Sequence, residues 1–158
     1  MTGSQGMTPS RLRVAVRRLA HGRDLELPEA ASSGSAGLDL RAAVDDDLVI
    51  PAAGRARVPT GLVVEIPPGW EGQVRPRSGL AHRHGVTLTN SPGTIDSDYR
   101  GEVQVLMINL GAEPFTIHRG DRIAQLLIAP VTRVHWDEVE VSTDSDRGTG
   151  GFGSTGRT

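Results

Sequence analysis

Apolar residues in this chain occur in short runs that are separated by glycine, proline and charged residues. These runs are rich in valine and isoleucine, and they recur at close spacing: Leu12–Val16, Leu48–Ile50, Gly61–Ile66, Gly72–Val74, Val86–Leu88, Val103–Leu110, Phe115–Ile117, Ile123–Pro130 and Val139–Val141. Short runs of this composition, bounded by turn residues, are typical of the strands of a β-sandwich or barrel. The pattern therefore predicts an all-β fold.

One of these runs also shows the alternation of a strand. Within Gly101–Leu110, Val103 and Val105 fall on one face, and Glu102 and Gln104 fall on the other. Successive side chains of a strand point to opposite faces of the sheet, so a valine face toward the core is expected.

Long amphipathic helices are absent from the pattern. Arg77–His84 is predicted as the one short helix, since Gly85 follows it and glycine commonly ends helices. Ser78 can cap this helix, or Arg77 and Ser78 can bind phosphate at its N-terminus, and the sequence leaves both alternatives open.

Length and composition set the limits on the class of protein. With 158 residues we expect one domain over residues 11–141, preceded by a disordered leader at 1–10 and followed by a flexible arm at 142–158. The chain has no cysteine, which excludes disulfides and fits a cytoplasmic protein. A net charge of −2 gives no indication of nucleic-acid binding, and no apolar run is long enough to span a membrane.

The C-terminal segment contains five glycines between Gly148 and Gly156. Glycine lets the backbone approach a ligand closely, and successive N–H groups can then point at one anion. Arg147 adds charge and Phe152 adds an aromatic face, a mixture that suits a nucleoside triphosphate. The alternative is an unstructured Gly/Ser-rich tail.

Three further positions carry candidate chemistry. Asp39 lies between two leucines, so its side chain points away from theirs, either to solvent or toward a metal ion. Asp96 follows a predicted turn and hairpin at Ser91–Thr94, and it is either the base that activates a water or a turn residue. Gln125 is polar within an apolar strand, so it needs partners: phosphate, another subunit or neighbouring backbone.

In this order, the segments Ala36–Ala43, Arg75–Ala81, Asn90–Val103, Arg119–Pro130 and Arg147–Gly156 resemble the five motifs of the trimeric dUTPase family. The resemblance implies a β-jelly roll with a short helix, assembled as a homotrimer. Its active sites would lie between subunits, and the arm of one subunit would close a site of its neighbours. The implied reaction is hydrolysis of dUTP to dUMP and pyrophosphate with Mg²⁺. That reaction limits uracil in DNA and supplies dUMP for dTTP synthesis.

The resemblance also implies residue roles. Asp96 would deprotonate the attacking water, Tyr99 would reject a ribose 2′-hydroxyl, and Asp39 would hold Mg²⁺ through water, the metal being bound mainly by substrate phosphates. The substrate-binding residues would be Arg77, Ser78, Gly79, Asn90, Gly93, Thr94, Ile95, Tyr99, Gln125, Arg147, Phe152, Gly153, Ser154 and Thr155. Asn90 and the main chain near Gly93 would read uracil, and Phe152 would stack on it.

Two alternative functions remain. The dCTP deaminases resemble this family in fold and assembly, but they use a glutamate beside the base and lack the Gly-rich arm with Phe152. A non-catalytic trimeric β-module would need no carboxylate such as Asp96. The chain has neither a lysine nor a Gly-x-x-x-x-Gly-Lys loop, so a P-loop NTPase mechanism is excluded.

Overall fold

The computed structural model describes residues 12–141, 145–146 and 148–150. Within them the chain forms eleven strands, a 3₁₀ turn η1 (Ala20–Gly22) and one helix, α1 (Ser78–His84). The strands are β1 (Ala15–Arg18), β2 (Leu38–Arg41), β3 (Leu48–Ile50), β4 (Arg55–Pro59), β5 (Leu62–Glu65), β6 (Trp70–Arg75), β7 (Val86–Leu88), β8 (Gly93–Ile95), β9 (Gln104–Asn109), β10 (Phe115–Ile117) and β11 (Arg122–Pro130). The all-β prediction is confirmed.

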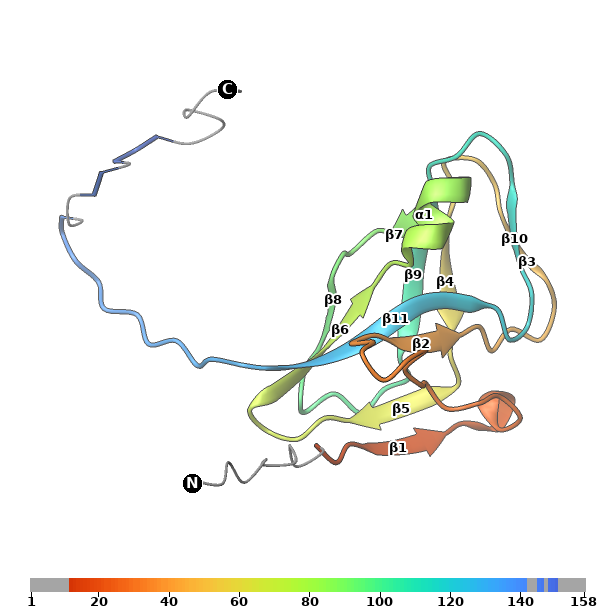
Figure 1. The fold of residues 1–158 in the computed structure, drawn as a ribbon, viewed down its shortest axis with the longest axis horizontal. Coiled ribbons are helices and arrows are strands. Elements are labelled where there is room, and N and C mark those ends of the chain that lie inside the picture. Colours follow the sequence, from red (N-terminus) through yellow and green to blue (C-terminus); the bar gives the residue numbers. More distant parts are fainter. Residues whose placement is uncertain (1–11, 142–144, 147, 151–158) are drawn as a thin grey trace, which may run out of the picture.

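Two sheets form the body of the molecule (Figure 1). The larger has the strand order β2-β11-β6-β8, and the smaller has the order β4-β9-β7. Two short ladders, β1-β5 and β3-β10, extend the structure at its sides. Every strand pair is antiparallel, and neighbouring strands are mostly distant in sequence, which explains why local turns reveal little of the topology.

One core joins the two sheets. Leu40 and Leu126 of the larger sheet share it with Val58, Val105 and Met107 of the smaller one. Val105 and Met107 are buried on β9, whereas Leu106 between them is exposed, so the predicted alternation is confirmed. Burying one such side chain contributes about 1.5–3 kcal/mol, and the interior of the fold therefore depends on aliphatic packing.

Helix α1 begins and ends where its sequence requires. Gly85 has a φ of 67°, a left-handed conformation that glycine adopts easily, and its N–H bonds the carbonyl of Ala81 at 3.0 Å. The predicted stop is therefore confirmed. Ser78 does not cap the helix, because Arg77 occupies the cap position and donates no side-chain capping bond.

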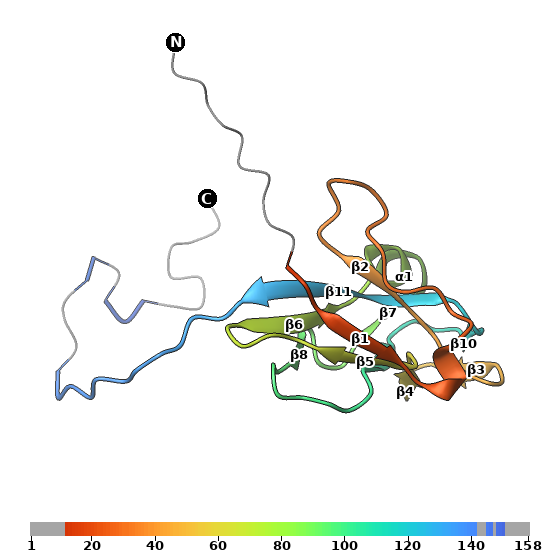
Figure 2. The same ribbon diagram turned by 90° about the horizontal axis from the view of Figure 1, so that it is seen from below.

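Two local predictions are wrong. Val139–Val141 forms no strand: β11 ends at Pro130, and the following residues leave the body as an extended, exposed segment (Figures 1 and 2). Ser91–Thr94 does contain a turn, with a cis peptide before Pro92, but no β7-β8 hairpin forms. Strand β7 pairs with β9, and β8 pairs with β6, so the turn connects two sheets. No helix in the described ranges is long and apolar enough to cross a membrane.

Candidate functional site

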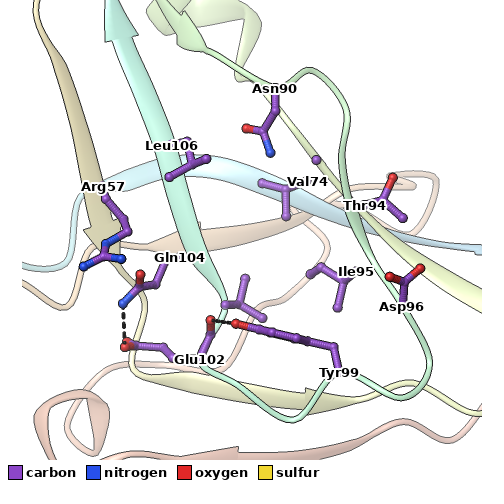
Figure 3. A pocket seen from close by; sticks show the side chains of 12 residues that line it. Arg57, Val74, Asn90, Thr94, Ile95, Asp96, Tyr99, Glu102, Gln104 and Leu106 are labelled. Carbon is purple, nitrogen blue, oxygen red and sulfur yellow. Dashed lines mark hydrogen bonds between the residues drawn. The ribbon is translucent and has the colours of Figure 1, made fainter.

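Two cavities collect all the predicted site residues that the structure describes. The first, of about 200 Å³, includes Asn90, Gly93, Thr94, Ile95, Asp96 and Tyr99 in its lining (Figure 3). The second, of about 460 Å³, includes Asp39, Arg77, Ser78, Gly79 and Gln125. Among the described residues, none lines both cavities.

Strand β8 builds one wall of the first cavity. It pairs with β6, and its side chains alternate: Gly93 and Ile95 are buried, and Thr94 is exposed. Asn90 lies against Gly93, where an added Cβ would come within 2.9 Å of the Asn90 amide nitrogen. Glycine at this position therefore lets the amide approach the backbone of the strand.

Asp96 follows β8 at the rim of the first cavity (Figure 3). Its residue is exposed, and within the described part of the chain its carboxylate has no hydrogen-bond or ion-pair partner. Its main-chain carbonyl accepts the N–H of Tyr99 at 3.1 Å, which closes a tight turn. The main chain of Asp96 is thus held by a turn, and its carboxylate oxygens are free to accept a proton, as general-base catalysis requires.

Tyr99 lies across the bottom of the view in Figure 3, with its ring between Asp96 and Glu102. Its hydroxyl donates a 2.9 Å hydrogen bond to the main-chain carbonyl of Glu102. An added Cβ on Gly101 would come within 2.6 Å of the ring, so the tyrosine packs on a position that only glycine can occupy without displacing it.

Asp39 occupies the second cavity as an ion-paired group. Its carboxylate contacts the Arg77 guanidinium at 3.2 Å and the Arg122 guanidinium at 3.1 Å. Arg75 also lines this cavity, so the lining contains three arginines and one carboxylate. The surplus of positive charge suits a polyanion, since arginine binds phosphate through paired N–H donors.

Gln125 lies between Asp39 and Arg75, because strand β11 runs between β2 and β6. Its side-chain amide donates a 3.0 Å hydrogen bond to the carbonyl of Pro76. Of the partners expected for this glutamine, neighbouring backbone is therefore present. The hydrogen bond connects β11 to the loop before α1. A role in phosphate binding stays a prediction.

The two cavities lie at different places on the larger sheet: the first is at the edge strand β8, and the second is lined from β2, β6 and β11. Val74 lines the first cavity and Arg75 lines the second, and these neighbours in β6 point to opposite sides. The register places Gln125 opposite Arg75, and Leu126 opposite Val74. One chain therefore does not bring Asp96 and Arg77 into a single cavity.

Several lining residues were missed by sequence reasoning. In the first cavity these are Arg57, Val74, Glu102, Val103, Gln104 and Leu106, and in the second the most important is Arg122. The alternation expected within Gly101–Leu110 had already placed Glu102 and Gln104 on one face, so that face was a usable signal. Arg122 carried no comparable signal, since its pairing with Asp39 depends on the register of β2 with β11.

Glu102 is the most strongly hydrogen-bonded carboxylate of the first cavity. Burial alone raises the pKa of the Glu102 carboxyl, but hydrogen bonds from His21, Gly61 and Gln104 together lower that pKa below its ordinary value. The group is therefore a structural anion at neutral pH rather than an acid or base.

Two further predictions concern a metal ion and the C-terminal arm. No group of three His, Cys, Asp or Glu side chains gathers within the described residues, so these residues form no cage for a metal ion. The predicted arm residues Arg147, Phe152, Gly153, Ser154 and Thr155 lie outside the described residues.

Comparison with known proteins finds one family. The dUTPase family model matches residues 23–156. A deoxyuridine 5′-triphosphate nucleotidohydrolase of Rhizobium etli (strain CIAT 652) is 62% identical over 141 residues, which cover 88% of this chain and 90% of that protein. The protein of the same name from Wolbachia pipientis wMel is 56% identical over 153 residues, covering 96% of this chain and 100% of that protein. A solved structure of the Staphylococcus bacteriophage 80alpha dUTPase with dUPNHPP is similar at a TM-score of 0.81 and 25% identity, covering 92% and 99% of the two chains.

Proposed function

Because this chain belongs to the dUTPase family, we propose that a water activated by Asp96 hydrolyses dUTP at the first cavity. The chain is a dUTP diphosphatase, which converts dUTP to dUMP. In the proposed step the water oxygen bonds to the α-phosphorus, and the bond from that phosphorus to the bridging oxygen breaks. Asp96 takes the proton of the water, and pyrophosphate leaves.

The exposed carboxylate of Asp96 is the observation that carries this mechanism. It has no partner in the described part of the chain, it lies at the rim of a cavity, and its backbone is held by a turn. A carboxylate with free oxygens can accept a proton from a bound water. The carboxylate of Asp39, in contrast, is occupied by ion pairs with Arg77 and Arg122.

The first cavity is suited to a nucleoside of limited size. The Asn90 amide and the main chain of Gly93 and Ile95 offer donors and acceptors to the edge of uracil. Thr94 lines the cavity beside them, and Tyr99 provides a flat face for the sugar. In this arrangement Tyr99 leaves no room for a ribose 2′-hydroxyl, and the enzyme would therefore prefer deoxyribose.

The second cavity is suited to the phosphates. Arg77, with the Ser78 hydroxyl, the Gly79 backbone and the Gln125 amide, would bind the triphosphate. The surplus of guanidinium groups offsets the charge of the substrate, and phosphoryl transfer depends mainly on positioning and charge neutralisation.

Mg²⁺ fits these residues as a metal carried by the substrate. Magnesium is usually held by one or two carboxylates together with substrate phosphates, and Asp39 is a carboxylate in the cavity assigned to the phosphates. Asp39 would hold the metal through water. When bound, the metal would neutralise charge on the triphosphate.

The separation of the two cavities supports a homotrimer with shared sites. A triphosphate that touches both Asp96 and Arg77 would be bound by cavities from two different copies of the chain, since one copy presents these residues in two cavities with no described lining residue in common. The segment after β11 exposes Val134, Trp136, Val139 and Val141, with Trp136 85% accessible, as expected of a segment that packs on a neighbour. In the proposed jelly-roll trimer, residues 142–158 close the site: Arg147, Gly153, Ser154 and Thr155 bind the γ-phosphate, and Phe152 covers uracil.

The proposed reaction would remove a nucleotide that polymerases can insert in place of dTTP. Its product, dUMP, is the substrate from which thymidylate is made. We therefore propose that the protein limits the incorporation of uracil into DNA and supplies dUMP for dTTP synthesis.

The first test is pyrophosphate release from dUTP, dTTP, dCTP and UTP with Mg²⁺, with ammonia followed in parallel. We expect release from dUTP alone, since the cavity reads both base and sugar. Release of ammonia from dCTP would instead identify a deaminase. If neither pyrophosphate nor ammonia is released from any of the four nucleotides, a binding module is favoured.

The second test addresses Asp96. Asp96→Asn should retain dUTP binding and lose turnover by about 10²–10⁴-fold, the usual cost of removing a positioned general base. Asp98→Asn is the matched control, because Asp98 is an exposed acid on the same loop that does not line the first cavity. Wild-type turnover by Asp96→Asn would refute the assignment of the base.

A further inference from the structure

The carboxylate of Glu102 joins three parts of the chain behind the first cavity. It accepts hydrogen bonds from His21 Nε2 at 2.8 Å, from the Gly61 N–H at 2.7 Å and from Gln104 Nε2 at 3.1 Å. Its side chain is only 16% exposed, whereas that of His21 is 33% exposed. Charge-assisted bonds of this kind are stronger than neutral ones, so the carboxylate is held firmly in place.

The same residue also holds Tyr99 through its main chain. The Tyr99 hydroxyl donates to the Glu102 carbonyl at 2.9 Å, and the ring packs on Gly101. The next peptide is fixed as well, since the Thr60 hydroxyl donates to the Val103 carbonyl at 2.6 Å and the Val103 N–H donates to Leu62 at 2.8 Å. The position of the tyrosine ring thus depends on where residue 102 is anchored.

The anchor comes from an element that does not line the cavity. His21 belongs to η1, which is 81 residues from Glu102 in sequence. Arg119 fixes η1 in turn: one guanidinium nitrogen donates to the His21 carbonyl at 2.7 Å and to the Asp24 carboxylate at 2.6 Å. The imidazole therefore projects from a restrained turn and is not a loose surface group.

From these contacts we infer that the His21–Glu102 pair is a positioning device for substrate selection. The pair fixes the position of the Tyr99 ring in the first cavity. Through that ring it determines how strongly the enzyme prefers a deoxyribonucleotide to a ribonucleotide. The inference rests on the proposed role of Tyr99 as the residue that meets the sugar. His21 touches no substrate and acts only through Glu102 and Tyr99.

The experiment compares kcat/KM for UTP and for dUTP in the full-length enzyme with Mg²⁺. His21→Ala removes the donor, and His21→Gln offers an amide N–H in its place. We expect His21→Ala to raise the UTP/dUTP ratio of kcat/KM about fivefold or more, the equivalent of one net hydrogen bond. His21→Gln should return the ratio most of the way to that of the parent.

Two variants act on Tyr99 directly, and a third is a matched control. Tyr99→Phe removes the bond to Glu102, and Gly101→Ala displaces the ring, so both should also raise the ratio. The control is His118→Gln, because His118 forms an equally short pair with Asp47, at 2.7 Å, and lines neither cavity. It should leave the ratio unchanged.

The outcomes separate this inference from the function on which it rests. If the parent enzyme fails to hydrolyse dUTP, or accepts UTP equally well, the proposed function fails. If Gly101→Ala raises the ratio but His21→Ala does not, Tyr99 selects the sugar without help from the pair, and the inference is overturned. A general loss of rate with an unchanged ratio in His21→Ala would likewise show a merely structural role.

Discussion

At the scale of single residues, Glu102 links stability to pH. Its folded-state pKa is lowered below the ordinary value of 4.5, so its charged form is favoured by folding. The stabilisation is present above pH 4.5 and is lost as the pH falls through the lower, folded-state value. We expect the melting temperature of the parent to exceed that of Glu102→Gln at pH 7, and the difference to shrink as the pH falls from about 5 toward 3.

The control for this prediction is Glu65→Gln. Glu65 is exposed at the end of β5, and its carboxylate has no hydrogen-bond or ion-pair partner within the described part of the chain. Its amide variant should melt like the parent across the same pH range. A difference for Glu102→Gln that stays constant from pH 7 to pH 3 would contradict the linkage.

Residue types could be read from the sequence, but their partners could not. Asp39 was predicted to point away from its leucine neighbours, and Leu40 is indeed buried while Asp39 lines a cavity. Gln125 was identified as a polar residue in need of a partner. That its partner is the Pro76 carbonyl depends on the β6-β11 register, and residues 49 positions apart leave no local signal of such a contact.

At the scale of elements, the end of α1 is set by backbone geometry. Gly85 has a φ of 67°, and a Cβ there would come within 2.8 Å of the Gly111 nitrogen. We expect Gly85→Ala to lower the free energy of unfolding by at least about 1 kcal/mol, because both the dihedral angle and the contact oppose a side chain. Denaturant titration measures this change.

Gly34→Ala is the matched control for the helix-end variant. Gly34 is exposed, an added Cβ would meet nothing within 4 Å, and its φ is not positive. It should unfold within a few tenths of a kcal/mol of the parent, or slightly above it. Equal losses in the two variants would show that glycine content, and not the left-handed geometry, accounts for the effect.

Local signals predicted the elements better than their pairing. The helix stop at Gly85 and the alternation along β9 were correct because each depends on neighbouring residues only. The hairpin at Ser91–Thr94 was wrong because turn residues do not determine which strands pair. The strand at Val139–Val141 was wrong because its apolar residues have no partner strand among the described residues.

At the scale of the whole molecule, the separation of the two cavities determines how an active site can be assembled. Asp96 and the first cavity lie at the edge strand β8, and Arg77 lines the second cavity together with residues of β2, β6 and β11. In a closed symmetric oligomer, the first cavity of one copy can meet the second cavity of the next at each interface. Light scattering should then give the mass of a trimer.

Subunit complementation tests the shared site itself. Asp96→Asn and Arg77→Ala should each be nearly inactive as pure proteins, because every site contains the defect. When the two variants are co-expressed with different tags and mixed trimers are isolated, about one site in three should receive both intact residues and regain turnover, since only one of the three interfaces of a mixed trimer joins them. If the mixed oligomers are no more active than the mean of the two pure variants, Asp96 and Arg77 of one chain serve the same site. The separation of the two cavities argues against that outcome, because no described residue lines both of them.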